Sequence, residues 1–159
     1  MSKEFKVEFG PVTHQNVDCL KMLVNKTFPL TYSDSLYAKI ATEYKEHSML
    51  AYLEDIPVGG ISCRENERNG GKSLYVIILS VLPKYRRGHI ATQLVQEVIK
   101  LASKNKELKS IFLHTPVGNS TAIEFYKKNG FHEAETEEGY YKSFETAQDN
   151  RAIVLERML

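Results

Sequence analysis

Hydrophobic and polar residues recur along the chain with two different periods, which separate predicted strands from predicted helices. Residues 4–9 alternate strictly, as in a half-buried strand, and a Gly-Pro pair stops them. A helix is predicted next, with Thr13 as a candidate cap, and a second helix restarts at Ser33 or Asp34 after an aromatic interruption at residues 28–32. The apolar positions of these helices are Val17, Leu20, Leu23 and Val24, then Leu36, Tyr37, Ile40, Ala41 and Tyr44.

Turn residues separate the strands predicted after these helices. Residues 49–53 and 58–63 are apolar runs joined by residues 54–57, and they indicate a hairpin. Asn69-Gly70-Gly71 is a strong turn signal that leads into residues 74–81. That run is rich in β-branched and aromatic residues and nearly unbroken in hydrophobicity, which is typical of a strand buried on both faces.

The last part of the chain alternates between helices and strands. A strand is predicted over residues 110–114, a helix is capped by Asn119-Ser120 and ended by Gly130, and two last strands start at Phe131 and Arg151. The predicted order is one strand, two helices, three strands, a helix, a strand, a helix and two strands, which makes an α/β layered domain. The apolar faces of its last two helices are Leu94, Val95, Val98, Ile99 and Ala102, then Ala122, Ile123, Phe125 and Tyr126.

Size and composition limit the classes of protein to consider. The chain has 159 residues, enough for one domain with a real core and too few for two, so one domain over residues 1–159 is expected. Contents of 42% hydrophobic and 26% charged residues are ordinary for a globular protein, so neither disorder nor a membrane span is expected, and no membrane is expected among the partners. A net charge of +1 argues against nucleic acid bound through a general basic field.

The cysteines and the N-terminus bear on the compartment. Cys19 and Cys63 lack the spacing of a metal site and indicate reduced thiols in a reducing compartment. No long apolar segment follows Met1-Ser2-Lys3-Glu4, so no secretory signal is expected. We therefore expect a cytoplasmic protein that can also be nuclear.

The residues around Gly88 have the chemistry of an anion site. A strand-like apolar run leads to Arg86 and Arg87, then to the glycine turn and the start of a helix. Such a turn lets backbone N–H groups approach an anion, the helix N-terminus adds roughly half a positive charge, and the two guanidinium groups add two more. The pattern predicts a phosphate site. The alternative is a capped helix that follows a buried strand.

The same stretch resembles the acetyl-CoA pyrophosphate loop of the GNAT superfamily of N-acetyltransferases. That loop contains Arg or Gln, two variable residues, Gly, one variable residue, then Gly or Ala. Arg86 opens the pattern and Ala91 closes it, but His89 stands where the superfamily usually has its first Gly. A side chain there can crowd the phosphates; alternatively Gly88 absorbs the unusual turn, while His89 points to solvent or donates a hydrogen bond to a phosphate.

This resemblance implies a GNAT fold, with a mixed central sheet of about seven strands and about four helices. It also implies acetyl-CoA as co-substrate and no metal. The residues that it implies for acetyl-CoA binding are Leu79, Val81, Arg86, Arg87, Gly88, His89, Ile90, Ala91, Thr92, Asn119 and Tyr126.

A narrower resemblance covers nearly the whole chain. Six blocks look like those of the catalytic subunits of NatE, the San family, which acetylate the α-amine of protein N-termini that begin with Met and a hydrophobic residue. The resemblance implies this activity, and it implies the large auxiliary subunit of NatA as a candidate partner. The blocks are residues 28–32, 74–77, 85–87, 111–114, 119–131 and 140–142.

Acyl transfer to an amine needs a deprotonated nucleophile. The pKa of an α-amino group is about 7.7–8.0 and that of lysine about 10.4, so deprotonation at pH 7 costs about 1 kcal/mol for the former and about 4–5 kcal/mol for the latter. Tyr75 and His114 lie on two strands that can be neighbours and can hold an ordered water that accepts the proton, and the family assigns them general-base work. The alternative is that Tyr75 is an ordinary aromatic residue of a strand and that His114 is a core histidine whose hydrogen bonds are satisfied within the fold. Tyr126 matches a tyrosine near the CoA sulfur, either as acid or in packing.

An apolar wall with tyrosine hydroxyls suits a Met side chain and a peptide backbone, and the alternative for these residues is a small satellite core. Two rival functions are a lysine acetyltransferase and a non-catalytic GNAT-fold subunit docked on the NatA complex. The residues that the resemblance implies for substrate binding are Phe28, Pro29, Leu30, Tyr32, Tyr75, Tyr140, Tyr141 and Phe144.

Overall fold

The fold is organised around a mixed sheet. The computed structural model describes residues 4–28, 31–141 and 150–159, and the seven strands found there lie in the order β1-β2-β3-β4-β5-β7-β6. β4 and β5 are parallel, and the other neighbouring strands are antiparallel. The strands are β1 (Glu8–Pro11), β2 (Ser48–Leu53), β3 (Ile56–Arg68), β4 (Gly71–Val81), β5 (Leu108–Pro116), β6 (His132–Glu137) and β7 (Ala152–Met158).

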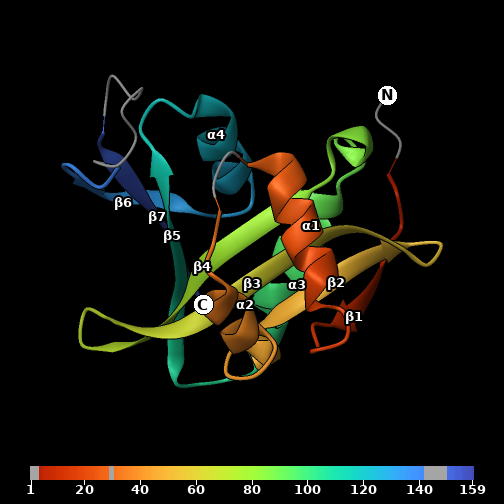
Figure 1. The fold of residues 1–159 in the computed structure, drawn as a ribbon. Helices are drawn as coiled ribbons and strands as arrows, with labels where there is room; N and C mark the ends of the chain where they lie inside the picture. The colour runs from red at the N-terminus through yellow and green to blue at the C-terminus, as the bar shows by residue number, and fades with distance from the viewer. Residues whose placement is uncertain (1–3, 29–30, 142–149) are drawn as a thin grey trace.

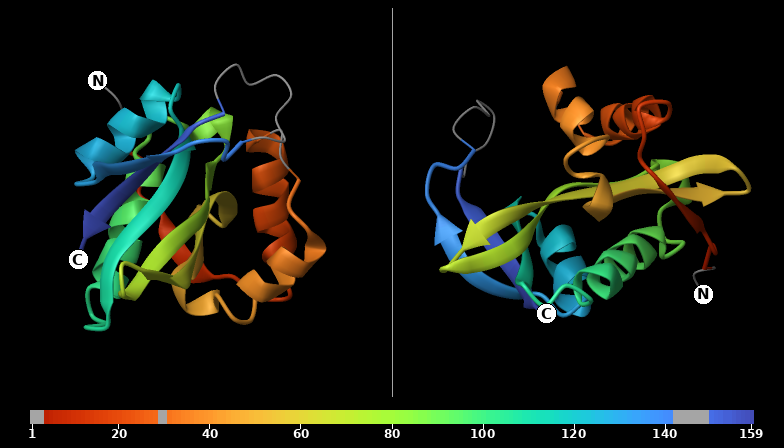
Figure 2. Two further views of the ribbon diagram at one scale, coloured as in Figure 1. Left: turned by 90° about the vertical axis from the view of Figure 1, so that its left-hand side faces the viewer. Right: turned by 90° about the horizontal axis from the view of Figure 1, so that it is seen from below.

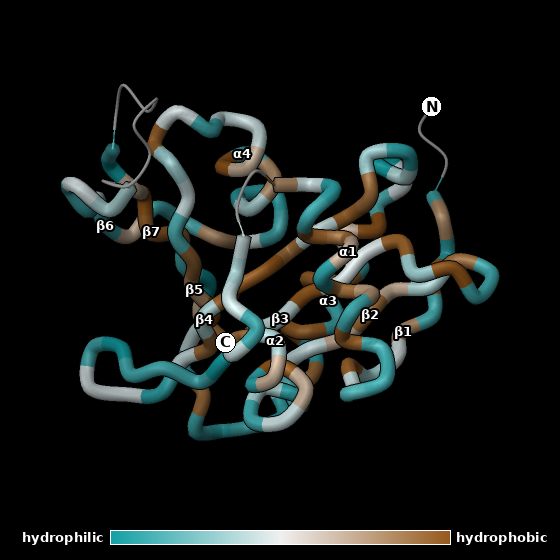
Figure 3. The backbone as a smooth tube through the Cα atoms, in the orientation of Figure 1, coloured by the Kyte–Doolittle hydropathy of each residue, from teal (hydrophilic) through white to brown (hydrophobic). Residues whose placement is uncertain are grey.

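Four α-helices in the described residues cover the two faces of this sheet. α1 crosses in front of the sheet in Figure 1, and the view from below in Figure 2 places α1 and α2 on one face and α3 and α4 on the other. The hydrophobic residues follow the central strands in Figure 3, whereas the tip of the β3–β4 hairpin is hydrophilic. The helices are α1 (Val17–Thr27), α2 (Asp34–Ile40), α3 (Ile90–Ala102) and α4 (Ser120–Lys128), with short 3-10 turns η1 (Lys45–His47) and η2 (Pro83–Tyr85).

Each face of the sheet has its own apolar core. Under α1 and α2, Leu20 and Ile40 pack with Leu50 of β2. Under α3 and α4, Leu94 packs with Leu74 of β4 in the larger cluster. None of the helices in the described ranges is long and apolar enough to cross a membrane.

The predicted α/β class and the predicted order of elements are confirmed. Ser33 is the N-cap of α2, where its Oγ accepts a hydrogen bond from the Leu36 N–H at 3.1 Å. The predicted hairpin is present, but its turn is Glu54 and Asp55 and not residues 54–57, because Ile56 and Pro57 already pair with β2; the two turn residues have left-handed φ values of 49° and 69°. Gly130 follows α4 with a φ of 90°, as the predicted helix stop requires.

The first strand was predicted at residues 4–9, and this is wrong because the strand is β1, Glu8–Pro11. Hydrophobic and polar residues do alternate over residues 4–9, but the segment before Glu8 forms hydrogen bonds with the turn before α3 and with α3 itself and does not extend β1. The Phe5 N–H donates to the Gly88 carbonyl at 3.0 Å, and Gln93 Nε2 donates to the Phe5 carbonyl at 2.6 Å. This segment therefore packs against the turn before α3, and Pro11 is accepted because β1 is an edge strand.

Two helix boundaries also differ from the prediction. α1 starts at Val17 with Asn16 at its N-cap position, while Thr13 opens a turn before it by accepting the Val17 N–H at its carbonyl. The second helix ends at Ile40, and the residues up to Tyr44 form turns. Periodic apolar spacing continued past the helix end because Tyr44 still packs against the same core.

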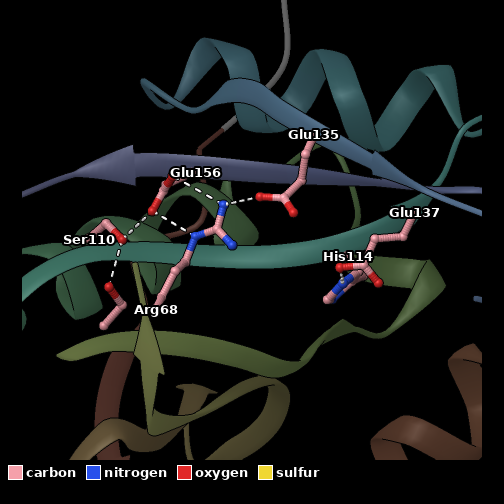
Figure 4. A network of polar contacts seen from close by, with 7 residues as sticks. Arg68, Ser110, His114, Glu135, Glu137 and Glu156 are labelled. Atoms are coloured by element: carbon pink, nitrogen blue, oxygen red, sulfur yellow. Dashed lines mark hydrogen bonds and ion pairs between the residues drawn. The ribbon is translucent and has the colours of Figure 1, made fainter. Parts of the chain in front are cut away.

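A buried ion pair ties the end of the sheet together. Arg68 Nε donates to Glu156 Oε2 at 2.9 Å, and its Nη2 donates to Glu135 Oε1 at 2.7 Å. Ser110 Oγ donates to Glu156 Oε2 at 2.6 Å and meets Ser73 Oγ at 2.8 Å. These contacts, most of which Figure 4 draws, join β3, β4, β5, β7 and β6 in one row.

Glu156→Gln is expected to lower the free energy of unfolding by about 2 kcal/mol at pH 7, because Arg68, whose side chain is only 11% exposed, loses the more buried of its two carboxylate partners. Burial opposes ionisation of Glu156, but hydrogen bonds from Arg68 and Ser110 outweigh it and hold the pKa of Glu156 below its usual value. A depressed pKa stabilises the fold above about pH 4.3, and this contribution is lost as the pH falls further. In urea titrations, the difference in the free energy of unfolding between wild type and Glu156→Gln should therefore be smaller at pH 4 than at pH 7.

The matched control is Glu135→Gln, which removes the half-exposed partner of the same arginine. Glu135→Gln should lower the free energy of unfolding by less than about 1 kcal/mol. An equal gap for Glu156→Gln at both pH values would contradict the assignment of the ion pair.

Candidate active site

The two central strands of the sheet diverge and open a cleft. β4 and β5 pair at Leu74 with Ile111 and at Tyr75 with Phe112, the last pair of their register, although β4 continues to Val81. Ile77 is the extra residue of a β-bulge against β3, and a bulge bends its strand. A cavity of about 970 Å³ lies along this part of β4.

The expectation that residues 74–81 are buried on both faces is corrected by this cleft. Leu74 and Val76 are buried, whereas Tyr75, Ile77 and Leu79 are half-buried. These last three line the cavity. The unbroken hydrophobicity of β4 therefore serves a core on one side and a ligand-sized space on the other.

Most of the predicted site residues line this one cleft. The predicted catalytic and acetyl-CoA residues that line it are Tyr75, His114, Tyr126, Leu79, Val81, Arg86, Arg87, Ala91 and Asn119. The predicted substrate residues that line it are Phe28, Tyr32, Tyr75, Tyr140 and Tyr141. Four predicted residues belong to the adjoining turn and to the start of α3: Gly88, His89, Ile90 and Thr92. Pro29, Leu30 and Phe144 lie outside the described residues.

The sequence reasoning missed several lining residues that share a face with the predicted ones. Ile77 follows Tyr75 by two strand positions, and Ala122 precedes Tyr126 by one helical turn. These spacings are the signals that could have found them. The missed residues are Thr27, Val76, Ile77, Ile78, Leu113, Thr115, Pro116, Thr121, Ala122 and Phe125.

Tyr75 and His114 meet at the point where the strands diverge. Tyr75 Oη lies 3.0 Å from His114 Nδ1, and 3.1 Å from Tyr140 Oη. The Tyr140 ring stacks on the His114 imidazole with a centroid distance of 4.1 Å and an interplanar angle of 6°. Parallel register brings the two residues together, since Tyr75 is opposite Phe112, two positions before His114. The pair can hold and accept a proton.

Three phenols of the cleft, those of Tyr75, Tyr126 and Tyr141, have a raised pKa and keep their protons at neutral pH. Burial raises the pKa of Tyr75, and the hydrogen bond with Tyr140 adds to this effect. Burial also raises the pKa of Tyr126, and it raises the pKa of Tyr141 to about 12. A phenolate is therefore disfavoured here, so Tyr75 can only relay a proton while it passes its own to His114.

The turn before α3 has an unusual backbone. Arg87 and His89 have left-handed φ values of 70° and 61°, and His89 is the N-cap of α3. The suggestion that Gly88 absorbs the unusual turn is wrong, because His89 itself adopts the conformation that glycine favours. Gly88 is needed for another reason: a Cβ there would clash with the ring of Phe5. Histidine is among the residues that tolerate a left-handed backbone better than most.

Two side chains fix the helices beside the cleft. Asn119 caps α4 as predicted, since its Oδ1 accepts a hydrogen bond from the Ala122 N–H at 3.2 Å. At the end of α1, Thr27 Oγ1 accepts a hydrogen bond from Ser80 Oγ of β4 at 2.8 Å. This second bond ties the end of α1, and hence Phe28, to the strand that carries Tyr75.

The cleft has different chemistry at its two ends. Arg86 and Arg87 bring positive charge near the N-terminus of α3, where an anionic group is favoured. Tyr75 and His114 form a proton-accepting pair between apolar and aromatic walls. Over the described ranges, no group of three or more His, Cys, Asp or Glu residues could hold a metal ion. The arrangement suits a ligand that is anionic at one end and reacts at the other.

Known proteins share this architecture. The family described as acetyltransferase (GNAT) family matches residues 18–131. The probable N-acetyltransferase san of Drosophila melanogaster is 40% identical over 153 residues, which cover 96% of this chain and 81% of that protein. N-alpha-acetyltransferase 50 of Danio rerio is 38% identical over 154 residues, which cover 97% of this chain and 89% of that protein.

A solved structure of an N-acetyltransferase is similar to this chain in fold and in sequence. Naa50 of Arabidopsis thaliana in complex with the bisubstrate analogue CoA-Ac-MVNAL superposes with a TM-score of 0.84 and 34% identity. The match covers 96% of this chain and 99% of that chain.

The turn predicts different outcomes for two neighbouring substitutions. Gly88→Ala should lower the free energy of unfolding by about 2 kcal/mol, because the added methyl group meets Phe5. His89→Gly should change it by less than about 1 kcal/mol, since relief of the left-handed backbone is offset by the greater freedom of unfolded glycine.

Calorimetry of His89→Gly should give an acetyl-CoA Kd within about threefold of wild type. Tightening of about tenfold or more would show instead that the imidazole crowds the phosphates.

Proposed function

The chain belongs to the acetyltransferase (GNAT) family, and on that premise we propose which substrate its cleft takes and how its residues act. The protein is an N-α-acetyltransferase that transfers the acetyl group of acetyl-CoA to peptide N-termini. The preferred N-terminus is Met followed by a hydrophobic residue. The observation that carries the mechanism is the bond of 3.0 Å between Tyr75 Oη and His114 Nδ1 inside the cleft.

The cleft has the groups that acetyl-CoA needs. Beyond Tyr75, β4 has left its register with β5, so its backbone N–H and C=O groups on that side are available to an amide-bearing chain. Arg86 and Arg87, with the N-terminus of α3, would hold the pyrophosphate. Acetyl-CoA supplies the acetyl group as a thioester.

Tyr75 and His114 accept the proton of the α-amine through an ordered water. The water gives a proton to the Tyr75 oxygen while Tyr75 passes its own to His114 Nδ1, so no phenolate forms. This modest base suffices because deprotonation of an α-amine at pH 7 costs about 1 kcal/mol, against about 4–5 kcal/mol for lysine. The same difference favours α-amines over lysine side chains.

Aromatic residues form the peptide side of the cleft. Phe28 and Tyr32 come from the segment after α1, Tyr140 and Tyr141 come from the turn after β6, and all four line the cleft. An apolar wall with hydroxyl groups binds a Met side chain and orients the backbone behind it. Tyr126 keeps its proton and positions the sulfur, since a thiolate with a pKa of about 8.5 leaves without much help.

The direct test uses a peptide that starts with Met-Leu and contains one internal lysine. After incubation with acetyl-CoA, mass spectrometry should locate the acetyl group on the α-amine, because only this amine is deprotonated at low cost. Acetyl found only on the lysine would contradict the proposed substrate. Failure to bind acetyl-CoA at all would indicate a non-catalytic subunit.

Variants in the same assay test the proposed base. Tyr75→Phe and His114→Ala should each slow turnover by about 10²-fold, the lower range for loss of general-base catalysis, and leave acetyl-CoA affinity unchanged. Tyr44→Phe and His14→Ala are matched controls outside the cleft and should match wild type. Normal turnover in both cleft variants would remove the Tyr–His pair from the mechanism.

A partner and a compartment are also proposed, the partner from the family resemblance and the compartment from the cysteines and the N-terminal sequence. The large auxiliary subunit of NatA is the proposed partner, and the cytoplasm, with the nucleus, is the proposed location. Both described cysteines are free, in keeping with a reducing compartment. Tagged protein expressed in cells should co-purify with that subunit and be seen in both compartments. If the tagged protein is active but the auxiliary subunit of NatA does not co-purify with it, the proposed docking on that subunit is contradicted.

A further inference from the structure

We infer that Glu137 is a positioning residue for His114: its carboxylate selects the tautomer in which Nε2 carries the hydrogen and Nδ1 accepts from Tyr75. This inference rests on the proposed function, since it assigns a partner to the base named there. Glu137 lies on β6, the edge strand, and sequence patterns alone did not connect it to the site.

The geometry places a carboxylate against the far side of the imidazole. His114 Nε2 lies 3.1 Å from Glu137 Oε1, and the side chains are 12% and 42% exposed respectively. The nitrogen is buried, and the contact is an electrostatic one rather than an aligned hydrogen bond. The other nitrogen, Nδ1, lies 3.0 Å from Tyr75 Oη. Figure 4 shows Glu137 next to the imidazole.

Charge complementarity decides between the two neutral tautomers. With hydrogen on Nδ1, the lone pair of Nε2 would face a carboxylate oxygen at 3.1 Å, which is repulsive. With hydrogen on Nε2, the partial positive charge of that N–H group lies near the negative carboxylate, and Nδ1 can accept from Tyr75. Which ring nitrogen carries the hydrogen is set by the partner of the other nitrogen. The carboxylate therefore prepares Nδ1 to receive the relayed proton.

The hydroxyl groups around Tyr75 agree with this tautomer. Tyr75 keeps its proton and has two polar neighbours, His114 Nδ1 and Tyr140 Oη. If Tyr75 donates to Nδ1, Tyr140 donates to Tyr75, and both bonds are satisfied. The polar and charged groups that contact the Tyr75–His114 pair include Tyr140 after β6, Glu137 of β6 and the Arg64 guanidinium of β3, which lies over the Tyr75 ring at 5.3 Å.

Arg68 explains why Glu137, and not its neighbour on β6, faces the imidazole. Glu135 and His114 are both opposite Val154 in the ladder, so Glu135 is level with the histidine. Its carboxylate instead turns to Arg68 Nη2 at 2.7 Å. The ion-pair row holds one carboxylate away from the base and leaves Glu137 in contact with it.

Glu137→Gln is the test substitution, because it keeps the shape and removes the charge. In ¹⁵N-histidine-labelled protein at pH 8, long-range NMR correlations of His114, assigned through His114→Gln, should show the Nε2–H tautomer in wild type and a mixture in Glu137→Gln. In kinetics with the Met-Leu peptide, kcat should fall by about tenfold while both KM values change by less than twofold. Glu137→Ala, as a second variant, should behave alike.

Glu133→Gln is the matched control on the same strand, since Glu133 contacts Lys127 at 3.7 Å outside the cleft. It should keep the wild-type tautomer and kcat. An unchanged tautomer in Glu137→Gln, an unchanged kcat, or a rise in KM alone would overturn the inference. Wild-type protein without acetyltransferase activity would overturn the proposed function itself, so the two failures are distinguishable.

Discussion

Parallel pairing between β4 and β5 reaches Tyr75 and Phe112 and then ends, and the geometry of the cleft follows from this limit. β4 keeps its hydrogen bonds to β3 as far as Val81, so the sheet stays intact while the side toward β5 opens. Backbone groups exposed in this way need a partner, and an amide-bearing ligand chain is a suitable one. Tyr75 is the last residue held by both neighbouring strands, which fixes its phenol at the edge of the opening.

Two sets of contacts anchor the elements on either side of this opening. α1 is tied to β4 through Ser80 and Thr27, so the aromatic loop after α1 starts from a fixed point. On the other side, Arg68 joins β3 to β7 and β6 through Glu156 and Glu135. Because β6 carries Glu137, this row of ion pairs also sets the surroundings of His114. A network that looks purely structural thus extends to the proposed base.

Local signals in the sequence predicted the elements well where they agreed with tertiary packing. The turn at Asn69, the caps at Ser33 and Asn119, and the pairing of Tyr75 with His114 all followed from spacing and residue type or from family resemblance. The first strand was misplaced because the alternation of residues 4–9 reflects packing against the turn before α3, and no local pattern reveals which element an alternating segment meets.

Other features depend on contacts between residues far apart in the chain. The need for glycine at position 88 comes from contact with Phe5. Histidine tolerates the left-handed backbone found at His89, but its presence in the sequence does not predict that backbone. Glu137 reaches His114 only because β6 pairs with β7 beside β5. A crystal structure with a CoA–Met-Leu-peptide bisubstrate analogue would show whether Tyr75 and His114 act on the reacting amine. It should place the acetylated nitrogen one water molecule from Tyr75 Oη, with the pyrophosphate at Arg86 and Arg87; a nitrogen remote from Tyr75 and His114 would contradict the mechanism.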